Sequence, residues 1–147
     1  MKLFKLITSV CAVSAAFMFA ACDDSTSANS NDEPAVTADC SVSDGVKVVS
    51  PKNGDSFKMG ETITVIYGSD VQGSGYRFVF KTSEEDAGID MLEESAGPEK
   101  PDGKTCYEQK VTLPADVAEP TETAIIRVIP YEKTAKAANS GTFKVTE

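Results

Sequence analysis

Hydrophobic residues are distributed along the chain in three different ways. Leu6 to Ala21 is a run of 16 residues that carries no charge and is mostly apolar. Asp23 to Asp39 contains no aromatic residue and consists mainly of Ser, Asp, Asn, Ala and Thr. Beyond residue 40, short β-branched or aromatic segments recur between turn-forming residues, and helical periodicity is weak. We therefore predict three parts, with boundaries at 1–21, 22–39 and 40–147.

Residues 1–21 have the layout of an export signal. Lys2 and Lys5 form a short basic region directly before the apolar run. A transmembrane helix needs roughly 20 apolar residues, so this run is short for a membrane span and suits a signal-peptide core. We expect the mature chain to leave the cytoplasm.

The segment Phe19-Ala20-Ala21-Cys22 ends the apolar run. It resembles the lipobox of bacterial lipoproteins, although Phe stands where Leu is usual. The resemblance implies that the Cys22 thiol is alkylated with a diacylglyceryl group and that Cys22 becomes the N-terminus. The alternative is a plain secreted protein, cleaved after Ala16, in which Cys22 is free or in a disulfide.

Residues 22–39 then form the lipidated N-terminus and a linker. Each buried methylene contributes about 0.8 kcal/mol, so more than one acyl chain gives stable attachment to the membrane. The linker cannot bury enough apolar surface to order itself, and as a flexible spacer it would hold the next part about 20–25 Å from the membrane. Asp23-Asp24 resemble an inner-membrane retention signal in enterobacterial-type sorting and a surface-export signal in other Gram-negative groups. They also fit a solvated spacer.

Residues 40–147 contain alternating patterns that predict strands. In Glu61–Tyr67, the side chains of Ile63, Val65 and Tyr67 share one face, and Tyr76–Lys81 alternates in the same way. Seven short strands are predicted, over 46–49, 61–67, 76–81, 88–92, 105–113, 123–129 and 140–146. One helical turn is predicted within 132–138. This spacing is typical of an all-β fold with a single antiparallel β-sandwich.

Four segments of this part also carry a family resemblance. They are Val48-Val-Ser-Pro-Lys-Asn-Gly54, Phe57 to Tyr67, Val111-Thr-Leu-Pro114, and Ser140-Gly-Thr-Phe-Lys-Val145. Together they resemble the immunoglobulin-like domain of Knh-like cell-wall proteins, which many bacterial surface lipoproteins share, with Tyr67 where Trp is usual. The resemblance implies an immunoglobulin-like fold in a surface setting and carries no catalytic residues.

Charge and composition reduce the number of function classes that this chain fits. The whole chain has a net charge of −9, and loss of Lys2 and Lys5 leaves 12 basic residues against 23 acidic ones, or −11. Such an acidic chain is not expected to bind nucleic acid. There is no His, which removes the usual general base and zinc ligand, and no Trp, which weakens a sugar-stacking platform. We expect no catalytic residue, no metal and no cofactor.

The cysteines predict one disulfide. Cys11 is lost with the signal and Cys22 is assigned to lipid, so Cys40 and Cys106 remain. An oxidising compartment favours their pairing. The bridge would close a loop of about 65 residues, worth about 4 kcal/mol in the chain-entropy description.

Two further sets of residues are candidates for binding sites. The acidic residues of 84–94 could bind calcium, but they lack EF-hand spacing and fit a solvated charged edge better. Tyr67, Tyr76 and Tyr107 lie in phase with the core faces, which leaves Tyr131, beyond a strand end, as the candidate ligand contact.

The expected function is that of a non-enzymatic, membrane-anchored envelope lipoprotein. It would be a monomer that displays an immunoglobulin-like module for adhesion, scaffolding or protein–protein interaction, with an envelope protein or a glycan as partner. The outer membrane or cell surface is favoured over the inner membrane. The alternative is a carbohydrate-binding lipoprotein that assists polysaccharide capture at the cell surface.

Overall fold

The computed structural model describes residues 38–116 and 120–147. The predicted signal peptide, Cys22 and the linker as far as residue 37 lie outside the described residues. The described part is an all-β sandwich, as predicted, with one short 3-10 helix at Thr134–Lys136 inside the expected 132–138 turn.

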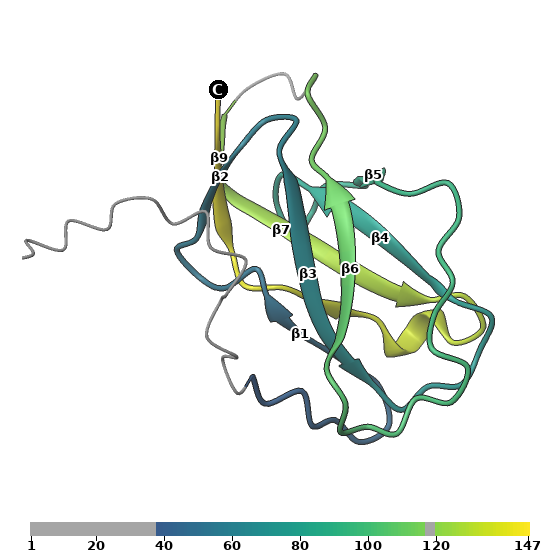
Figure 1. The fold of residues 1–147 in the computed structure, drawn as a ribbon. Coiled ribbons are helices and arrows are strands. Elements are labelled where there is room, and N and C mark those ends of the chain that lie inside the picture. The colour runs from purple at the N-terminus through teal and green to yellow at the C-terminus, as the bar shows by residue number, and fades with distance from the viewer. Residues whose placement is uncertain (1–37, 117–119) are drawn as a thin grey trace, which may run out of the picture. The chain divides into compact units, whose positions relative to one another are not determined.

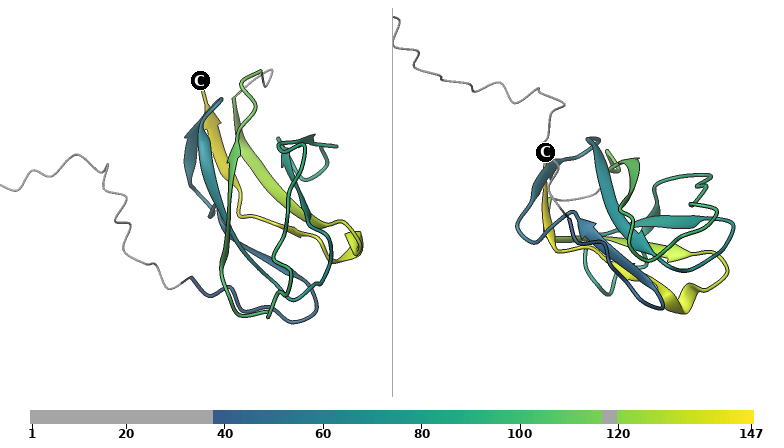
Figure 2. Two further views of the ribbon diagram at one scale, coloured as in Figure 1. Left: turned by 45° about the vertical axis from the view of Figure 1, so that its right-hand side comes forward. Right: turned by 60° about the horizontal axis from the view of Figure 1, so that its bottom comes forward.

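The sandwich consists of a smaller and a larger sheet. The smaller sheet has the order β1 (Val46–Ser50), β3 (Thr62–Ser69), β6 (Tyr107–Thr112). The larger sheet has the order β2 (Ser56–Lys58), β9 (Phe143–Thr146), β7 (Thr121–Pro130), β4 (Tyr76–Lys81), β5 (Ile89–Asp90), with β8 (Ala138–Asn139) also paired to β7. Figures 1 and 2 show β3 and β6 running on one side of β4 and β7.

The strand order is that of an immunoglobulin-like sandwich. In that fold, the first, second and fifth main strands share one sheet, and the third, sixth and seventh share the other. Here β1, β3 and β6 take the first set of positions and β4, β7 and β9 the second. All pairs are antiparallel except β2 with β9, which is parallel.

The core lies between the facing sides of the two sheets. Alternate residues of each strand point inward because the side-chain period of a strand is two. The predicted inward faces are confirmed: the buried residues are Ile63, Val65 and Tyr67 of β3, Tyr76, Phe78 and Phe80 of β4, and Phe143 and Val145 of β9. The Tyr67 ring meets Tyr76 and Phe78 edge-on, with centroid distances of 5.3 and 5.5 Å.

Two strands, β2 and β8, were not predicted. They contain three and two residues, which is too short for an alternating pattern to identify them. Each forms because a longer neighbour offers free backbone groups: β2 pairs with β9, and β8 pairs with β7. Gly68 and Ser69, expected in a loop, extend β3 because they pair with Lys47 and Val46 of β1.

The predicted disulfide is present. Cys40 and Cys106 are joined with their Cα atoms 5.2 Å apart. The segment around Cys40 lies directly against β3, since a Cβ atom on Gly68 would be 1.9 Å from the Cys40 carbonyl oxygen. The Val42 amide donates to the Gly103 carbonyl (2.9 Å), and the Gly103 amide donates to the Ser69 carbonyl (3.0 Å). The bridge therefore ties the N-terminal end of the described residues to β3 and to the segment before β6.

The double substitution Cys40→Ser/Cys106→Ser is expected to lower the free energy of unfolding by about 4 kcal/mol, because the unfolded chain loses its cross-link. Urea unfolding measures this change. Dithiothreitol should lower the unfolding midpoint of the natural chain and leave that of the double variant unchanged. An equal effect of the reductant on both proteins would contradict a stabilising role for the bridge.

Candidate functional site

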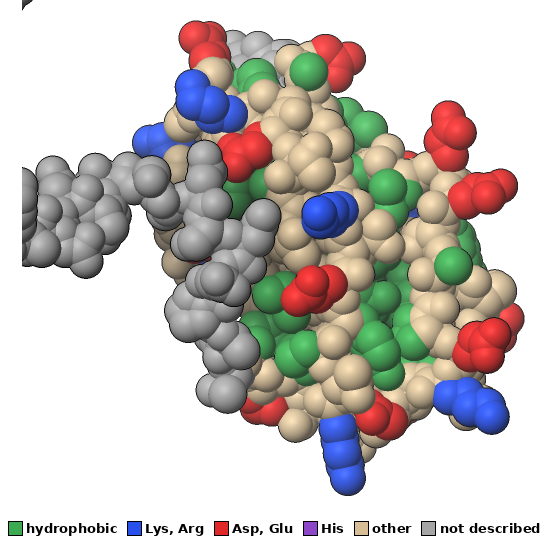
Figure 3. Space-filling view, viewed as in Figure 1, with side chains coloured by type: hydrophobic (Ala, Val, Ile, Leu, Met, Phe, Trp, Pro, Cys, Tyr) green, Lys and Arg blue, Asp and Glu red, His purple; other side chains and the backbone are tan. Residues whose placement is uncertain are grey.

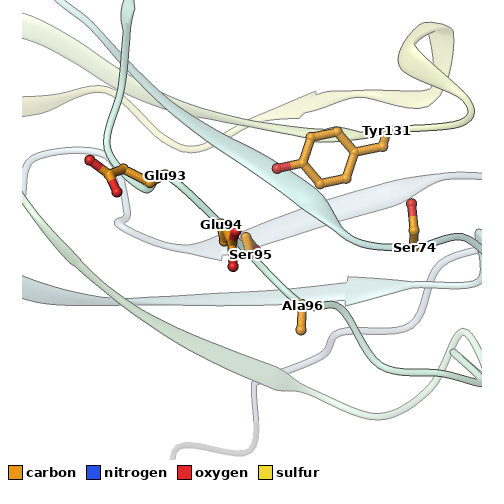
Figure 4. Close-up of a pocket in the computed structure, with 6 residues that line it drawn as sticks. All are labelled: Ser74, Glu93, Glu94, Ser95, Ala96 and Tyr131. Carbon is orange, nitrogen blue, oxygen red and sulfur yellow. The ribbon is translucent and has the colours of Figure 1, made fainter.

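An open pocket lies at one end of the sandwich. Its volume is about 370 Å³, and its lining combines one aromatic ring with short and acidic side chains: Ser74, Glu93, Glu94, Ser95, Ala96 and Tyr131. Figure 4 shows the Tyr131 ring on one side and the segment Glu93–Ala96 on the other, with Ser74 at one end.

Three separate stretches of chain meet at this pocket. Ser74 belongs to the loop between β3 and β4, Glu93–Ala96 follow β5, and Tyr131 directly follows β7. The register of β4 with β7 places Tyr76 opposite Pro130. As a result, the Tyr131 amide donates a hydrogen bond to the Gly75 carbonyl (3.1 Å), which fixes the base of the Tyr131 side chain at the start of β4.

Two glycines allow the segment after β5 to approach β4. Gly75 has a φ of +153°, and a Cβ atom there would lie 2.0 Å from the Ser95 carbonyl oxygen and 3.1 Å from Cε2 of Tyr131. A Cβ atom on Gly97 would lie 2.3 Å from Cε2 of Tyr76. No side chain fits at either position, so the pocket wall depends on glycine at both.

The loop that carries Ser74 is fixed at its first residues. The carboxylate of Asp70 accepts hydrogen bonds from the backbone amides of Asp44 and Gly45, the latter at 2.7 Å. These bonds lower the pKa of Asp70 below its ordinary value of 3.8. The Tyr76 hydroxyl lies 2.8 Å from Ser69 Oγ and 3.0 Å from the Val71 carbonyl oxygen, and burial raises its pKa.

The pocket presents acceptor groups and one accessible ring. Tyr131 is 41% exposed and Glu93 and Glu94 are exposed, whereas Ser95 is 8% exposed. The buried Ser95 Oγ has no hydrogen-bond partner among the described residues. Neither glutamate forms an ion pair with a cation within 38–116 or 120–147. The arrangement can accept hydrogen bonds, offer a π-face and hold positive charge.

The sequence-predicted residues are distributed as follows. Tyr131 lines the pocket. Tyr67 and Tyr76 are buried in the core, and Tyr107 is half-buried against it, as expected. The disulfide of Cys40 and Cys106 lies apart from the residues that line the pocket. Cys22 lies outside the described residues.

The acidic residues of 84–94 do not act as one group. Arg77 binds the Asp90 carboxylate through two hydrogen bonds of 3.0 and 2.7 Å. Asp86 accepts hydrogen bonds from the backbone amide and hydroxyl of Thr82, both at 2.9 Å. Within the part of the chain that the structure describes, no three acidic or cysteine side chains are placed to hold a metal ion. Only Glu93 and Glu94 of this set line the pocket.

Sequence reasoning missed Ser74, Ser95 and Ala96 as lining residues. Serines are common in loops and carry no specific signal on their own. The available signal was the pair of glycines, Gly75 and Gly97, that flank a strand start and an acidic segment. Both glycines allow the segment after β5 to approach the start of β4. This contact joins segments about 20 residues apart, so a local sequence pattern cannot reveal it.

One face of the sandwich carries mixed charge. Figure 3 shows side chains of both signs spread over the face that includes β3 and β6. Among the described residues, no helix is long and apolar enough to cross a membrane.

Neither a scan against protein-family models nor a search of the curated proteins finds a match to this chain.

The substitution Gly75→Ala is expected to lower the free energy of unfolding by about 3 kcal/mol, because backbone strain adds to the clash with the Ser95 carbonyl. Gly54→Ala is the matched control, since Gly54 has a φ of +88° with nothing within 4 Å of the new Cβ atom. That control should cost about 1 kcal/mol. Equal losses in urea unfolding would contradict the close approach at Gly75.

The carboxyl of Asp70 is expected to titrate below 3.8 in the folded chain, because two backbone amides stabilise its charged form. A lowered folded-state pKa means that the carboxylate stabilises the fold above the unfolded pKa and that this contribution is lost as the pH falls through the folded pKa. NMR titration of the Asp70 Cγ resonance measures the folded value, and the urea-unfolded chain gives the reference. A folded midpoint at or above the reference would refute the assignment.

Proposed function

We propose that this protein is a non-enzymatic, lipid-anchored lipoprotein of the cell envelope. It carries an immunoglobulin-like module for adhesion, scaffolding or protein–protein interaction. The observation that carries the proposal is the segment Phe19-Ala20-Ala21-Cys22 at the end of an uncharged run that begins at Leu6. In this proposal, Cys22 holds the acyl chains and the sandwich is the displayed part.

The sandwich supports a binding role in three ways. Its disulfide suits an oxidising compartment outside the cytoplasm. Its pocket is open and lies at the end of the sandwich where loops between strands of both sheets meet, as in binding modules of this architecture. Its mixed-charge surface favours recognition of a specific partner over attachment to nucleic acid.

The proposed position is the outer membrane or the cell surface. A segment of 17 residues, Asp23 to Asp39, separates Cys22 from Cys40 in the sequence, and it begins with Asp23-Asp24, which resemble a surface-export signal of some Gram-negative groups.

The substitution Cys22→Ala is expected to abolish incorporation of labelled fatty acid and to move the protein from the membrane to the soluble fraction, because the thiol that receives the lipid is gone. Labelling with an alkyne-tagged fatty acid, followed by fractionation, measures both effects. Cys11→Ala is the matched control, since it removes a thiol from the predicted signal peptide and should change neither result. Unchanged membrane partitioning of Cys22→Ala would overturn the proposed anchor.

A further inference from the structure

We infer that the pocket formed by Ser74, Glu93–Ala96 and Tyr131 binds an organic ammonium group. The group could belong to a lysine side chain or to an amino sugar, which present the same charged nitrogen. This inference goes beyond the proposed function, because it assigns a ligand chemistry to a particular site and is independent of the lipid anchor.

The pocket carries negative charge that no cation among the described residues compensates. Glu93 and Glu94 both line the pocket, and neither forms an ion pair within the described residues. Arg77, a nearby cation on β4, is engaged by both carboxylate oxygens of Asp90. The whole chain carries a charge of −9, so no general excess of cations offsets these two carboxylates. A positively charged ligand therefore gains attraction here, and an anionic ligand is repelled.

The pocket also presents an exposed aromatic ring. Tyr131 is one of two large hydrophobic residues that are exposed among the described residues, with 41% of its surface accessible. Figure 4 shows its ring facing the pocket, with the hydroxyl toward the side of Glu93 and Glu94. The face of a tyrosine ring attracts an ammonium group placed over it. Ring and carboxylates thus act on the same ligand charge.

The pocket wall also contains a hydroxyl without a hydrogen-bond partner. Ser95 lines the pocket and is 8% exposed, and its Oγ has no hydrogen-bond partner in the described part of the chain. A buried hydroxyl without a partner is unfavourable, so native structures rarely leave one. Ser74 and Ser95 both line the pocket, so an ammonium group there brings N–H donors to a wall that contains an unpartnered hydroxyl.

The dimensions favour an organic cation over a metal ion or a neutral sugar. A pocket of about 370 Å³ is much larger than a bare ion needs, and residues 38–116 and 120–147 contain no cluster of metal-binding side chains. A neutral sugar would use the ring and the hydroxyls but would leave both carboxylate charges unpaired. Exposed carboxylates give weak ion pairs, so affinity for a single ammonium group should be in the millimolar range.

The test uses two pairs of probes that differ by one acetyl group. Glucosamine is compared with N-acetylglucosamine, and Nα-acetyl-lysine amide with its Nε-acetylated form. Each probe is titrated into the ¹⁵N-labelled full chain in detergent micelles at a pH where the free amines are charged. The amide signals of Ser74 and Ala96 report occupation of the pocket. We expect the charged member of at least one pair to bind roughly tenfold more tightly than its acetylated counterpart.

Variants separate the contributions of charge and ring. Glu93→Gln/Glu94→Gln should weaken binding of the charged probe roughly tenfold, because it removes both carboxylate charges. Glu84→Gln/Glu85→Gln is the matched control: it makes the same charge change at exposed residues that do not line the pocket, and it should have no such effect. Tyr131→Leu should weaken binding, whereas Tyr131→Phe, which keeps the ring, should retain it.

Three outcomes would overturn the inference. One is binding of the neutral and charged probes with equal affinity, which would indicate a sugar or amide site. A second is equal weakening by the two double glutamine variants, which would indicate long-range attraction only. The third is the absence of chemical-shift changes at Ser74 and Ala96 with every charged probe. If none of these outcomes occurs, the ratio of the affinities for glucosamine and for the lysine derivative identifies whether the ammonium group comes from an amino sugar or from a lysine side chain.

Discussion

The packing of β3 against β4 and β7 is the contact on which the other features depend. Tyr67, near the end of β3, has its ring edge-on to Tyr76 and Phe78 of β4, so aromatic contacts hold the two sheets together at this level. The same packing fixes the start of β4, where Gly75 and Tyr76 lie, and the end of β7, where Tyr131 leaves the sheet. The pocket is therefore built on the ends of two core strands, and its position follows from the core.

The second constraint is that two positions, Gly75 and Gly97, cannot carry a side chain. At Gly75 and Gly97 the chain segments approach more closely than any side chain permits. This approach brings Ser95 to the pocket wall across from the Tyr131 ring, next to the exposed Glu93 and Glu94. A site made in this way is well defined without deep burial, which suits reversible recognition of a small charged group on a partner.

The sequence predicted the fold well because its strands alternate clearly. The inward faces of β3, β4 and β9 follow from a period of two, and the pairing of Cys40 with Cys106 follows if Cys11 belongs to a signal peptide and Cys22 to a lipid anchor. The short strands β2 and β8 could not be predicted, since their formation depends on pairing with distant strands. Tyr131 was found because it lies beyond a strand end. Ser74, Ser95 and Ala96 were not, because only the tertiary contact at Gly75 brings them to that ring.

Protease treatment of intact cells tests the central claim, that the sandwich is displayed outward from a lipid at Cys22. The account predicts that protease added outside the cells cuts the chain between Asp23 and Asp39. The released fragment would keep the bridge between Cys40 and Cys106, and N-terminal sequencing would locate the cut. A chain that stays intact on whole cells and is cut only after the envelope is broken would contradict outward display.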